Sequence, residues 1–406
     1  MKTTVLLTRL LYGACLLLVS CSTTDHSPAV TQAAAESPME VPVIPEEPVP
    51  DQLAPSEGIG AEVQERGVRS KQLGKNLALL NVAPAQAIAA LPGEFAFRTT
   101  KGYYVTALDG GGRTADPVLV TASLSAGTYE RFRIAPTYPN TPHDKSLQTG
   151  RGNYLPAMNG GGLIGGAFHT DATQAKDWER FRLLDLSVNN FAPSYYAFQT
   201  NKGSYVTAVG AGGKYADAFH TDAKQIQDWE KFRIVKCGDI GSGLEYGILA
   251  ANGSFLKAEL AAGSAQGDLW LDSYAGPQTR FKFIRQSDGT YALQTSNGVN
   301  FVTALGGGGQ VQKYLKCDVG LSGACLDGYS TIFHTDAKQV QAWEKFRVID
   351  QGNCTYALQT TSSFVVGIYK DSGGRTLLTT RRDGASTANE KFQLITYGLA
   401  SPIVLQ

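Results

Sequence analysis

Short runs of alternating hydrophobic and polar residues recur along the chain from about residue 95 to residue 396. YVTA at 104–107 and FVTA at 301–304 alternate in this way and are rich in β-branched residues, which is typical of half-buried strands. A polar turn precedes each run and glycines follow it, as in KGYYVTALDGGG at 101–112. The pattern predicts three or four short strands per unit and leaves little room for helix.

Six such units follow one another when the chain is aligned on the phenylalanine of the sequence WEKFR. The equivalent residues are Phe132, Phe181, Phe232, Phe281, Phe346 and Phe392. The steps between them are 49, 51, 49, 65 and 46 residues, and the long step contains the insertion CDVGLSGAC at 317–325. This periodicity predicts a repeat architecture in which the units close on one another, because one such unit cannot bury both of its faces.

Three units also share a longer sequence, FHTDATQAKDWERFR at 168–182, FHTDAKQIQDWEKFR at 219–233 and FHTDAKQVQAWEKFR at 333–347. We expect the Thr-Asp pair to cap the turn that follows and the tryptophan to pack beneath it. The glutamate should accept backbone or indole hydrogen bonds. Replacing Trp229 or Phe232 by alanine should then cost about 3–5 kcal/mol. A second aromatic set should help to fill the cores, namely Tyr104, Tyr154, Tyr205, Phe255, Phe301 and Phe364.

The repeated motif resembles the fascin-type β-trefoil over about residues 95–396. It consists of an apolar-polar-Thr strand, N/K-G-x-[YF]-V-T-A, a glycine-rich turn and W-E-x-F-x-[IV]. In that family each domain carries the motif three times, so six copies imply two tandem β-trefoils, at 93–236 and 237–397, followed by a tail at 398–406. The fourth unit lacks HTDA and WE, and the sixth has Asn389 in place of tryptophan. A six-bladed propeller is the alternative, although its blades would usually need four longer strands.

The N-terminus has the proportions of a signal peptide at residues 1–20, with Lys2 and Arg9 before the apolar run LLYGACLLLV. The sequence LVSC resembles the lipobox of bacterial lipoproteins, which implies that Cys21 carries lipid and anchors the protein to a membrane. An ordinary secretory signal with a chance cysteine is the alternative. By family analogy the location is the bacterial cell envelope, at the periplasmic or surface face of the outer membrane. Residues 21–92 should be a disordered tether rich in Pro, Ala and Glu, with room for short helices.

Composition narrows the function. The chain has 36 basic and 36 acidic residues and no basic block, which argues against nucleic acid as a partner. Four cysteines remain beyond Cys21, an even number that suggests disulfides in an exported protein. Cys317 and Cys325 flank the insertion and are the expected pair, which leaves Cys237 and Cys354 to pair with each other. The Cys317–Cys325 spacing has no matching His/Cys pair nearby, so we expect no structural zinc.

The HTDA segments and several tyrosines outside the core pattern are the candidate ligand contacts. These are His169, Asp171, His220, Asp222, His334, Asp336, Tyr103, Tyr215 and Tyr314. No third ligand and no nucleophile recurs with the His-Asp pairs, so neither a metal site nor catalysis is expected, and no cofactor is implied. The glycine runs lack GKS/T and a following helix, so they predict turns rather than phosphate loops.

The resemblance implies a non-enzymatic binding protein, because β-trefoils of this kind serve as binding modules with repeated shallow sites. Several sites on one rigid body gain avidity on a polymer, which favours polysaccharide binding or adhesion to a glycan. A protein partner, an actin-crosslinking-like role and a structural role in the envelope are the alternatives. Fold alone does not choose between them.

Overall fold

The computed structural model of the chain describes residues 93–136, 144–187, 194–259, 268–309, 329–370, 374, 376–382, 387–399 and 401–402. All regular elements within these ranges are β-strands and short 3-10 turns, which confirms the predicted all-β class. The predicted signal peptide, Cys21, the tether, Tyr314 and the Cys317–Cys325 pair lie outside the described residues.

Six strands of the first three units close into a ring, called ring 1 here. Antiparallel pairing runs from β1 to β10, β7, β6, β5 and β4 in turn. The ring closes where Phe95 and Phe132 exchange backbone hydrogen bonds of 2.8 and 2.7 Å. The strands are β1 (Glu94–Thr99), β4 (Arg133–Pro136), β5 (Asp144–Gln148), β6 (Phe181–Asp185), β7 (Tyr196–Thr200) and β10 (Phe232–Cys237).

Hairpins project from ring 1, one for each unit. They are formed by β2 (Tyr104–Ala107) with β3 (Leu119–Ser123), and by β8 (Tyr205–Ala208) with β9 (Phe219–Ala223). In the second unit, single bridges join Tyr154 to Ala172 and Ala157 to Phe168 at the equivalent place. The glycine runs form the 3-10 turns η2 (Leu108–Gly110), η3 (Met158–Gly160) and η5 (Val209–Ala211), and η6 (Asp228–Glu230) precedes β10.

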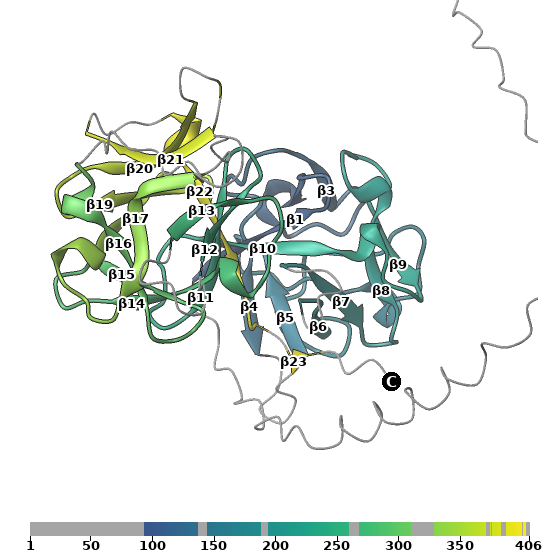
Figure 1. Cartoon of the computed structure of the whole chain (residues 1–406). Helices are drawn as coiled ribbons and strands as arrows, with labels where there is room; N and C mark the ends of the chain where they lie inside the picture. The colour runs from purple at the N-terminus through teal and green to yellow at the C-terminus, as the bar shows by residue number, and fades with distance from the viewer. Residues whose placement is uncertain are drawn as a thin grey trace, which may run out of the picture. The chain divides into compact units, whose positions relative to one another are not determined.

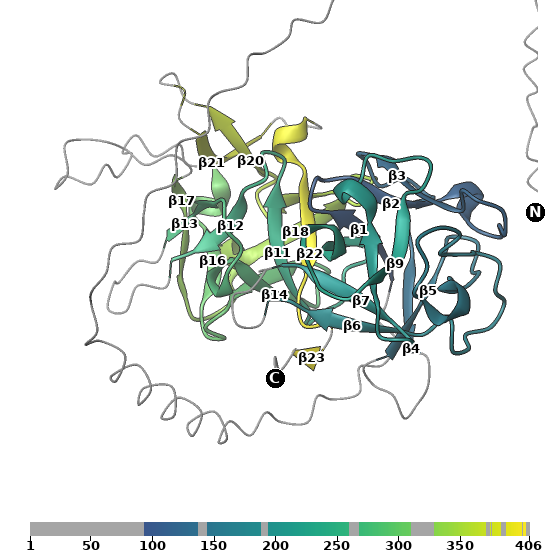
Figure 2. The ribbon, with the colours of Figure 1, turned by 90° about the vertical axis from the view of Figure 1, so that its right-hand side faces the viewer.

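The last three units repeat this pattern as ring 2. Antiparallel pairing runs from β11 to β14, β15, β18, β19 and β22, and β22 returns to β11. The strands are β11 (Glu245–Ala250), β14 (Arg280–Arg285), β15 (Tyr291–Thr295), β18 (Lys345–Asp350), β19 (Tyr356–Thr360) and β22 (Phe392–Thr396). Figures 1 and 2 show ring 1 in the blue and teal part of the chain and ring 2 in the green and yellow part.

Ring 2 also carries three hairpins. These are β12 (Phe255–Ala258) with β13 (Asp268–Asp272), β16 (Phe301–Ala304) with β17 (Tyr329–Ala337), and β20 (Val365–Lys370) with β21 (Thr376–Arg381). Short turns complete the units: η7 (Pro277–Thr279), η8 (Leu305–Gly308), η9 (Ala342–Glu344) and η10 (Ala388–Glu390).

Each ring encloses its own cluster of buried hydrophobic side chains. All six aligned phenylalanines, at positions 132, 181, 232, 281, 346 and 392, are 1% exposed or less, as predicted. Of the second aromatic set only Tyr104 and Phe255 are fully buried. In the sixth unit the strand position predicted for Phe364 belongs to Val365, which pairs with Gln359. The prediction for Phe364 was therefore one residue out of register.

The two rings are joined through β10, β11 and β22. Val235 of β10 pairs with Ile395 of β22, and Tyr196 Oη donates to the carbonyl of Thr396 at 3.0 Å. A disulfide connects Cys237 to Cys354, the pairing expected from the sequence, inside a third buried cluster that includes Tyr104 and Phe255. This contact makes ring 1 and ring 2 neighbours through backbone, side-chain and covalent links.

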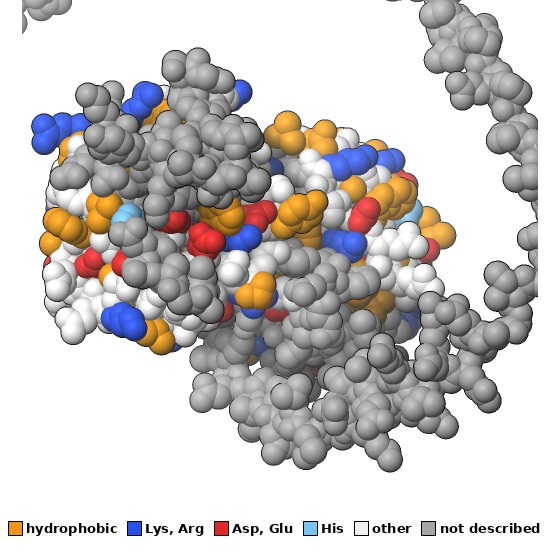
Figure 3. All heavy atoms as spheres, viewed as in Figure 1, with side chains coloured by type: hydrophobic (Ala, Val, Ile, Leu, Met, Phe, Trp, Pro, Cys, Tyr) orange, Lys and Arg blue, Asp and Glu red, His pale blue; other side chains and the backbone are white. Residues whose placement is uncertain are grey.

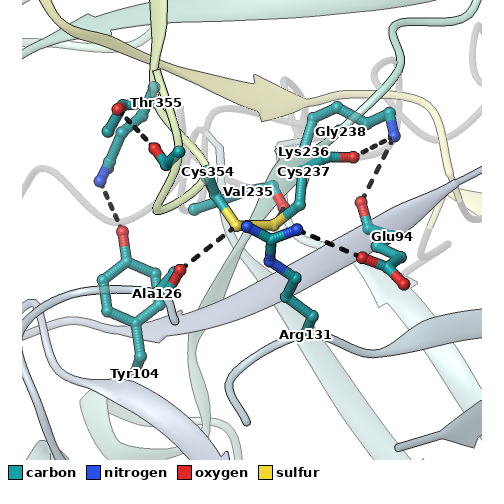
Figure 4. The surroundings of a disulfide bond; sticks show 12 residues. Glu94, Tyr104, Ala126, Arg131, Val235, Lys236, Cys237, Gly238, Cys354 and Thr355 are labelled. Atoms are coloured by element: carbon teal, nitrogen blue, oxygen red, sulfur yellow. Dashed lines mark hydrogen bonds and ion pairs between the residues drawn. A yellow bond between two sulfur atoms is a disulfide. The ribbon is translucent and has the colours of Figure 1, made fainter. Parts of the chain in front are cut away.

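Charged groups surround the disulfide (Figure 4). Lys236 is fully buried, and its ammonium group donates to the carbonyl of Cys237 at 2.6 Å and to that of Glu94 at 3.4 Å. Burial lowers the pKa of Lys236 to about 8, although the Asp239 and Glu94 carboxylates act in the opposite direction. Arg131 forms an ion pair with Glu94 at 3.5 Å.

The chain end differs from the predicted tail. Leu399 is 3% exposed and belongs to the core of ring 1, although it follows the last strand of ring 2. Beyond it, β23 (Ser401–Pro402) pairs in parallel with β6. The segment after ring 2 therefore returns to ring 1 and completes its packing.

Candidate functional site

A buried glutamate holds the WE corner of the repeat. In the third unit Glu230 is 5% exposed and accepts from Thr207 Oγ1 at 2.7 Å and from the Gln227 backbone N–H at 2.8 Å. The fifth unit repeats both bonds at Glu344, with Thr303 and Gln341 as donors, each at 2.8 Å. These carboxylates are used as internal acceptors, as the sequence analysis expects, so they have a scaffolding role.

In two other units, different residues form the hydrogen bonds that hold this corner. In the sixth unit Gly367 stands where the first, third and fifth units have threonine, and the hydroxyl of Tyr369 donates to Glu390 instead. The missing side chain makes this possible, because a Cβ on Gly367 would lie 2.9 Å from the Tyr369 ring. In the fourth unit Thr279 replaces the glutamate and accepts from the Gly276 N–H at 3.0 Å.

The threonine of HTDA does not cap its own turn, which corrects the expectation from sequence. Thr170 is fully buried and accepts from the backbone N–H of Arg113, in the glycine turn of the first unit, at 3.0 Å. Thr221 accepts in the same way from Leu163 of the second unit at 3.2 Å. Thr121 closes the cycle by accepting from Lys214 of the third unit at 3.2 Å. Thr121, Thr170 and Thr221 therefore link neighbouring units of ring 1, and we call these three contacts the threonine seam.

The His-Asp candidates are not a common site. His169 Nδ1 lies 3.9 Å from Asp171, whereas His220 Nε2 lies 2.9 Å from Asp217, three residues before it. His334 and Asp336 are half-buried in ring 2, and Asp222 is half-buried in ring 1. Among the residues that the structure describes, no group of three or more His, Cys, Asp or Glu side chains is placed to hold a metal ion.

The tyrosine candidates also differ from one another. Tyr215 is 61% exposed, as expected for a ligand contact. Tyr103 is half-buried, and its ring packs against the glycine turn of the third unit, where a Cβ on Gly213 would lie 3.2 Å from it. Tyr103 is therefore a packing residue in the first instance.

The tryptophans lie at the surface and not beneath the turn, where they were expected from the sequence. Trp178, Trp229 and Trp343 are 42%, 46% and 48% exposed. Tyr129 occupies the same position in the first unit and is 48% exposed. We call these four residues the aromatic corners. In Trp229-Glu230-Lys231-Phe232 the buried residues are Glu230 and Phe232, and the 3-10 turn η6 places Trp229 with its side chain toward solvent.

At two corners of ring 1 a basic side chain borders the same glycine as the aromatic ring. A Cβ placed on Gly160 would lie 3.6 Å from Trp178 Cδ1 and 3.5 Å from Lys202 Cγ, so both side chains border the same glycine. Gly110 has the same neighbours in Tyr129 and Arg151, at 3.5 and 3.4 Å. In the third unit the turn residue Thr100, next to Lys101, donates to the carbonyl of Asp228 at 3.1 Å, which brings that turn to Trp229. Lys101, Arg151 and Lys202 are all exposed.

Ring 1 also contains a cavity of about 300 Å³, called the axial cavity here, which was not predicted. Equivalent segments of its three units line it, at residues 116–119, 165–168 and 216–219. They immediately precede the threonine seam, so the seam brings them together. No single segment could have revealed the cavity, because the three lie about 50 residues apart in the sequence.

Charged side chains of both signs lie interspersed on the face shown in Figure 3. No helix within the described ranges is long and apolar enough to cross a membrane.

No family model matches the chain, and no curated protein does. Among solved structures, the chain is similar to a mosquitocidal holotoxin, with 10% identity over 77% of this chain and 35% of that one and a TM-score of 0.30. It is similar to the BEL β-trefoil at 8% identity, over 39% of this chain and 97% of that one, with a TM-score of 0.29. It is also similar to the agglutinin from Abrus precatorius at 12% identity, over 76% and 98% of the two chains, with a TM-score of 0.27. The match to the first of these spans about a third of that protein's length.

Proposed function

We propose that each ring with its hairpins is one fascin-like β-trefoil, that the two stand in tandem, and that the protein binds polysaccharide without catalysis. The observation that carries this proposal is the set of aromatic corners, each 42–48% exposed at an equivalent position of the repeat. Half-exposed rings on rigid turns present a flat apolar face, on which the C–H face of a sugar can stack at low entropic cost.

The arrangement favours a polymer over a small molecule. Tyr129, Trp178 and Trp229 repeat around ring 1, and separate weak contacts on one rigid body bind a repeating chain with avidity. The neighbouring Lys101, Arg151 and Lys202 favour acidic sugars, because a carboxylate or sulfate on a stacked residue would lie near an exposed basic side chain. Trp343 in ring 2 lacks such a cation, since Ser362 occupies the equivalent turn position.

The glutamates of the corners support a non-enzymatic role. A hydrolytic pair needs two carboxylates directed at the substrate. Glu230 and Glu344 instead accept from a threonine hydroxyl and a backbone N–H inside the fold. Their removal should therefore affect folding before any chemistry.

The test is binding of the purified full-length chain to insoluble and immobilised polysaccharides, neutral and acidic. We expect binding to an acidic polymer that falls at least about tenfold in the triple variant Tyr129→Ala/Trp178→Ala/Trp229→Ala. Tyr274→Ala is the matched control, because Tyr274 is 80% exposed but does not occupy a corner. Unchanged binding in the triple variant, or no binding by folded wild-type protein, would reject the proposal and direct the search to a protein partner.

We also propose that Cys21 is lipidated and anchors this glycan-binding protein at the bacterial cell envelope. The support is the lipobox-like sequence LVSC at residues 18–21. Metabolic labelling with an alkyne fatty acid should tag the wild-type chain and not the Cys21→Ala variant. Equal labelling of both would contradict the anchor while leaving the binding proposal intact.

A further inference from the structure

The axial cavity has an apolar floor. Leu119, Phe168 and Phe219, one from each unit of ring 1, line it and are 6%, 3% and 7% exposed. The two phenyl rings meet edge to face, with centroids 6.0 Å apart and planes at 89°. A ligand in the cavity would therefore contact aromatic and aliphatic carbon at its base.

The rim of the cavity is acidic. Asp116 and Asp217 line it, and no Lys or Arg is among its lining residues. Asp116 has no hydrogen-bond or ion-pair partner among the described residues, and its Oδ2 lies 3.6 Å from the point that a Cβ on Gly166 would occupy. Asp217 contacts His220 at 2.9 Å. The equivalent segment of the second unit is Gly165-Gly166, so no side chain closes the cavity on that side.

The acidic rim and the apolar floor together exclude several classes of ligand. An anion would meet two carboxylates, and a divalent metal ion would find too few ligands, since two carboxylates fall short of the six or more oxygens that Ca²⁺ requires. A cation with an apolar body satisfies both parts, because the charge pairs with the rim while the body lies against the phenyl rings. A volume of about 300 Å³ is at the lower end of ligand sites, so the ligand is small.

We propose that the axial cavity binds a small organic ammonium cation, with the charge at Asp116 and Asp217 and the apolar body against Phe168 and Phe219. The proposal is independent of polysaccharide binding at the aromatic corners. The ammonium can belong to an amino sugar with a free amine or to a choline headgroup. Glucosamine and choline are therefore separate arms of the test.

The test is calorimetric or saturation-transfer NMR titration of the full chain with cyclohexylamine, glucosamine and choline, and with cyclohexanol as the uncharged match. We expect saturable binding of cyclohexylamine and at least one natural amine, and binding of cyclohexanol at least about tenfold weaker. The tighter of the two natural amines identifies the source of the ligand.

The double variant Asp116→Asn/Asp217→Asn should weaken amine binding by at least about tenfold. Asp109→Asn is the matched control: Asp109 is an exposed carboxylate of ring 1 paired with Arg113, and its φ of 56° suits asparagine. Gly165→Phe should block the cavity without loss of folding, because a Cβ there meets nothing within 4 Å. No binding of any amine, or equal binding by wild type and double variant, would overturn the proposal.

Discussion

At the scale of single residues, the repeat depends on where polar groups are buried. Glu230 is enclosed while the tryptophan beside it faces solvent, although the sequence analysis gave both an interior role. Composition favours the opposite arrangement, because tryptophan is usually more buried than glutamate. The carboxylate is tolerated because two donors converge on it.

Replacing these neighbours by alanine should therefore give opposite results. Glu230→Ala removes the acceptor for Thr207 and the Gln227 N–H and leaves both unsatisfied, so we expect a loss of about 2–4 kcal/mol in unfolding free energy. Trp229→Ala removes a 46% exposed ring and should cost less than about 1 kcal/mol, which replaces the larger loss expected from sequence. Urea unfolding of both variants measures the difference, and an equal loss in both would refute this assignment.

Lys236 should make stability depend on pH. Its pKa is about 8 in the folded protein and 10.5 when unperturbed, so between these values the unfolded chain binds one more proton than the folded protein. Stability contributed at this site therefore rises with pH through this window. Relative to Lys236→Met, the wild type should gain up to about 3 kcal/mol between pH 7 and pH 10.5.

Urea unfolding of both proteins at pH 7, 8, 9, 10 and 10.5 measures that gain. The control is Lys338→Met at an exposed lysine, which should follow the wild type at every pH. A constant difference between wild type and Lys236→Met across the series would show that Lys236 stays charged in the folded protein.

At the scale of elements, the glycine turns join one unit to the next. Gly161 has φ 102° and ψ 179°, a conformation that is readily available only to glycine. A Cβ there would lie 2.3 Å from Thr200 Oγ1 of the following unit. Gly111 and Gly212 make the same approach to Thr149 and Thr99, so the three contacts form a cycle around ring 1.

Gly161→Ala should therefore lower the unfolding free energy by at least about 2 kcal/mol, from backbone strain and the contact with Thr200 together. Gly276→Ala provides the comparison, because Gly276 has an extended φ of −158° and open space around its Cβ position. That variant should stay within about 0.5 kcal/mol of the wild type. Thermal unfolding of the two variants measures the difference. A similar loss in both would show that these turns tolerate no side chain in general, and not that Gly161 is specifically strained.

Prediction from sequence succeeded where the information was local and repeated. Strands form at segments such as YVTA, although all four residues at 104–107 are buried and the strand is not half-buried as predicted. The buried phenylalanines follow from their fixed place in WEKFR. It failed where a partner lies in another unit: Thr170 bonds to Arg113, not to its own turn. The axial cavity was not predicted for the same reason, because it forms only where three segments distant in sequence come together.

At the scale of the whole molecule, the disulfide between Cys237 and Cys354 spans 117 residues and joins the end of β10 to the turn before β19. A crosslink that closes so long a loop removes much of the unfolded chain's freedom. Cys237→Ala/Cys354→Ala should therefore lose about 3–5 kcal/mol of unfolding free energy.

Urea unfolding with and without a phosphine reductant tests this expectation. Reductant should lower the midpoint of the wild type and leave that of the double variant nearly unchanged. A reductant effect of equal size in both proteins would assign the stabilisation to other cysteines.

The position of Leu399 has a consequence for how the protein is made. Synthesis delivers the chain from its N-terminus, so the strands of ring 1 leave the ribosome well before residue 399 does. Yet Leu399 belongs to the core of ring 1, and β23 pairs with β6. The hydrophobic core of ring 1 therefore stays incomplete until ring 2 has been translated. Ring 1 thus begins to fold first and is completed last. A premature stop codon shortly before Leu399 would destabilise ring 1, although the truncation lies after ring 2.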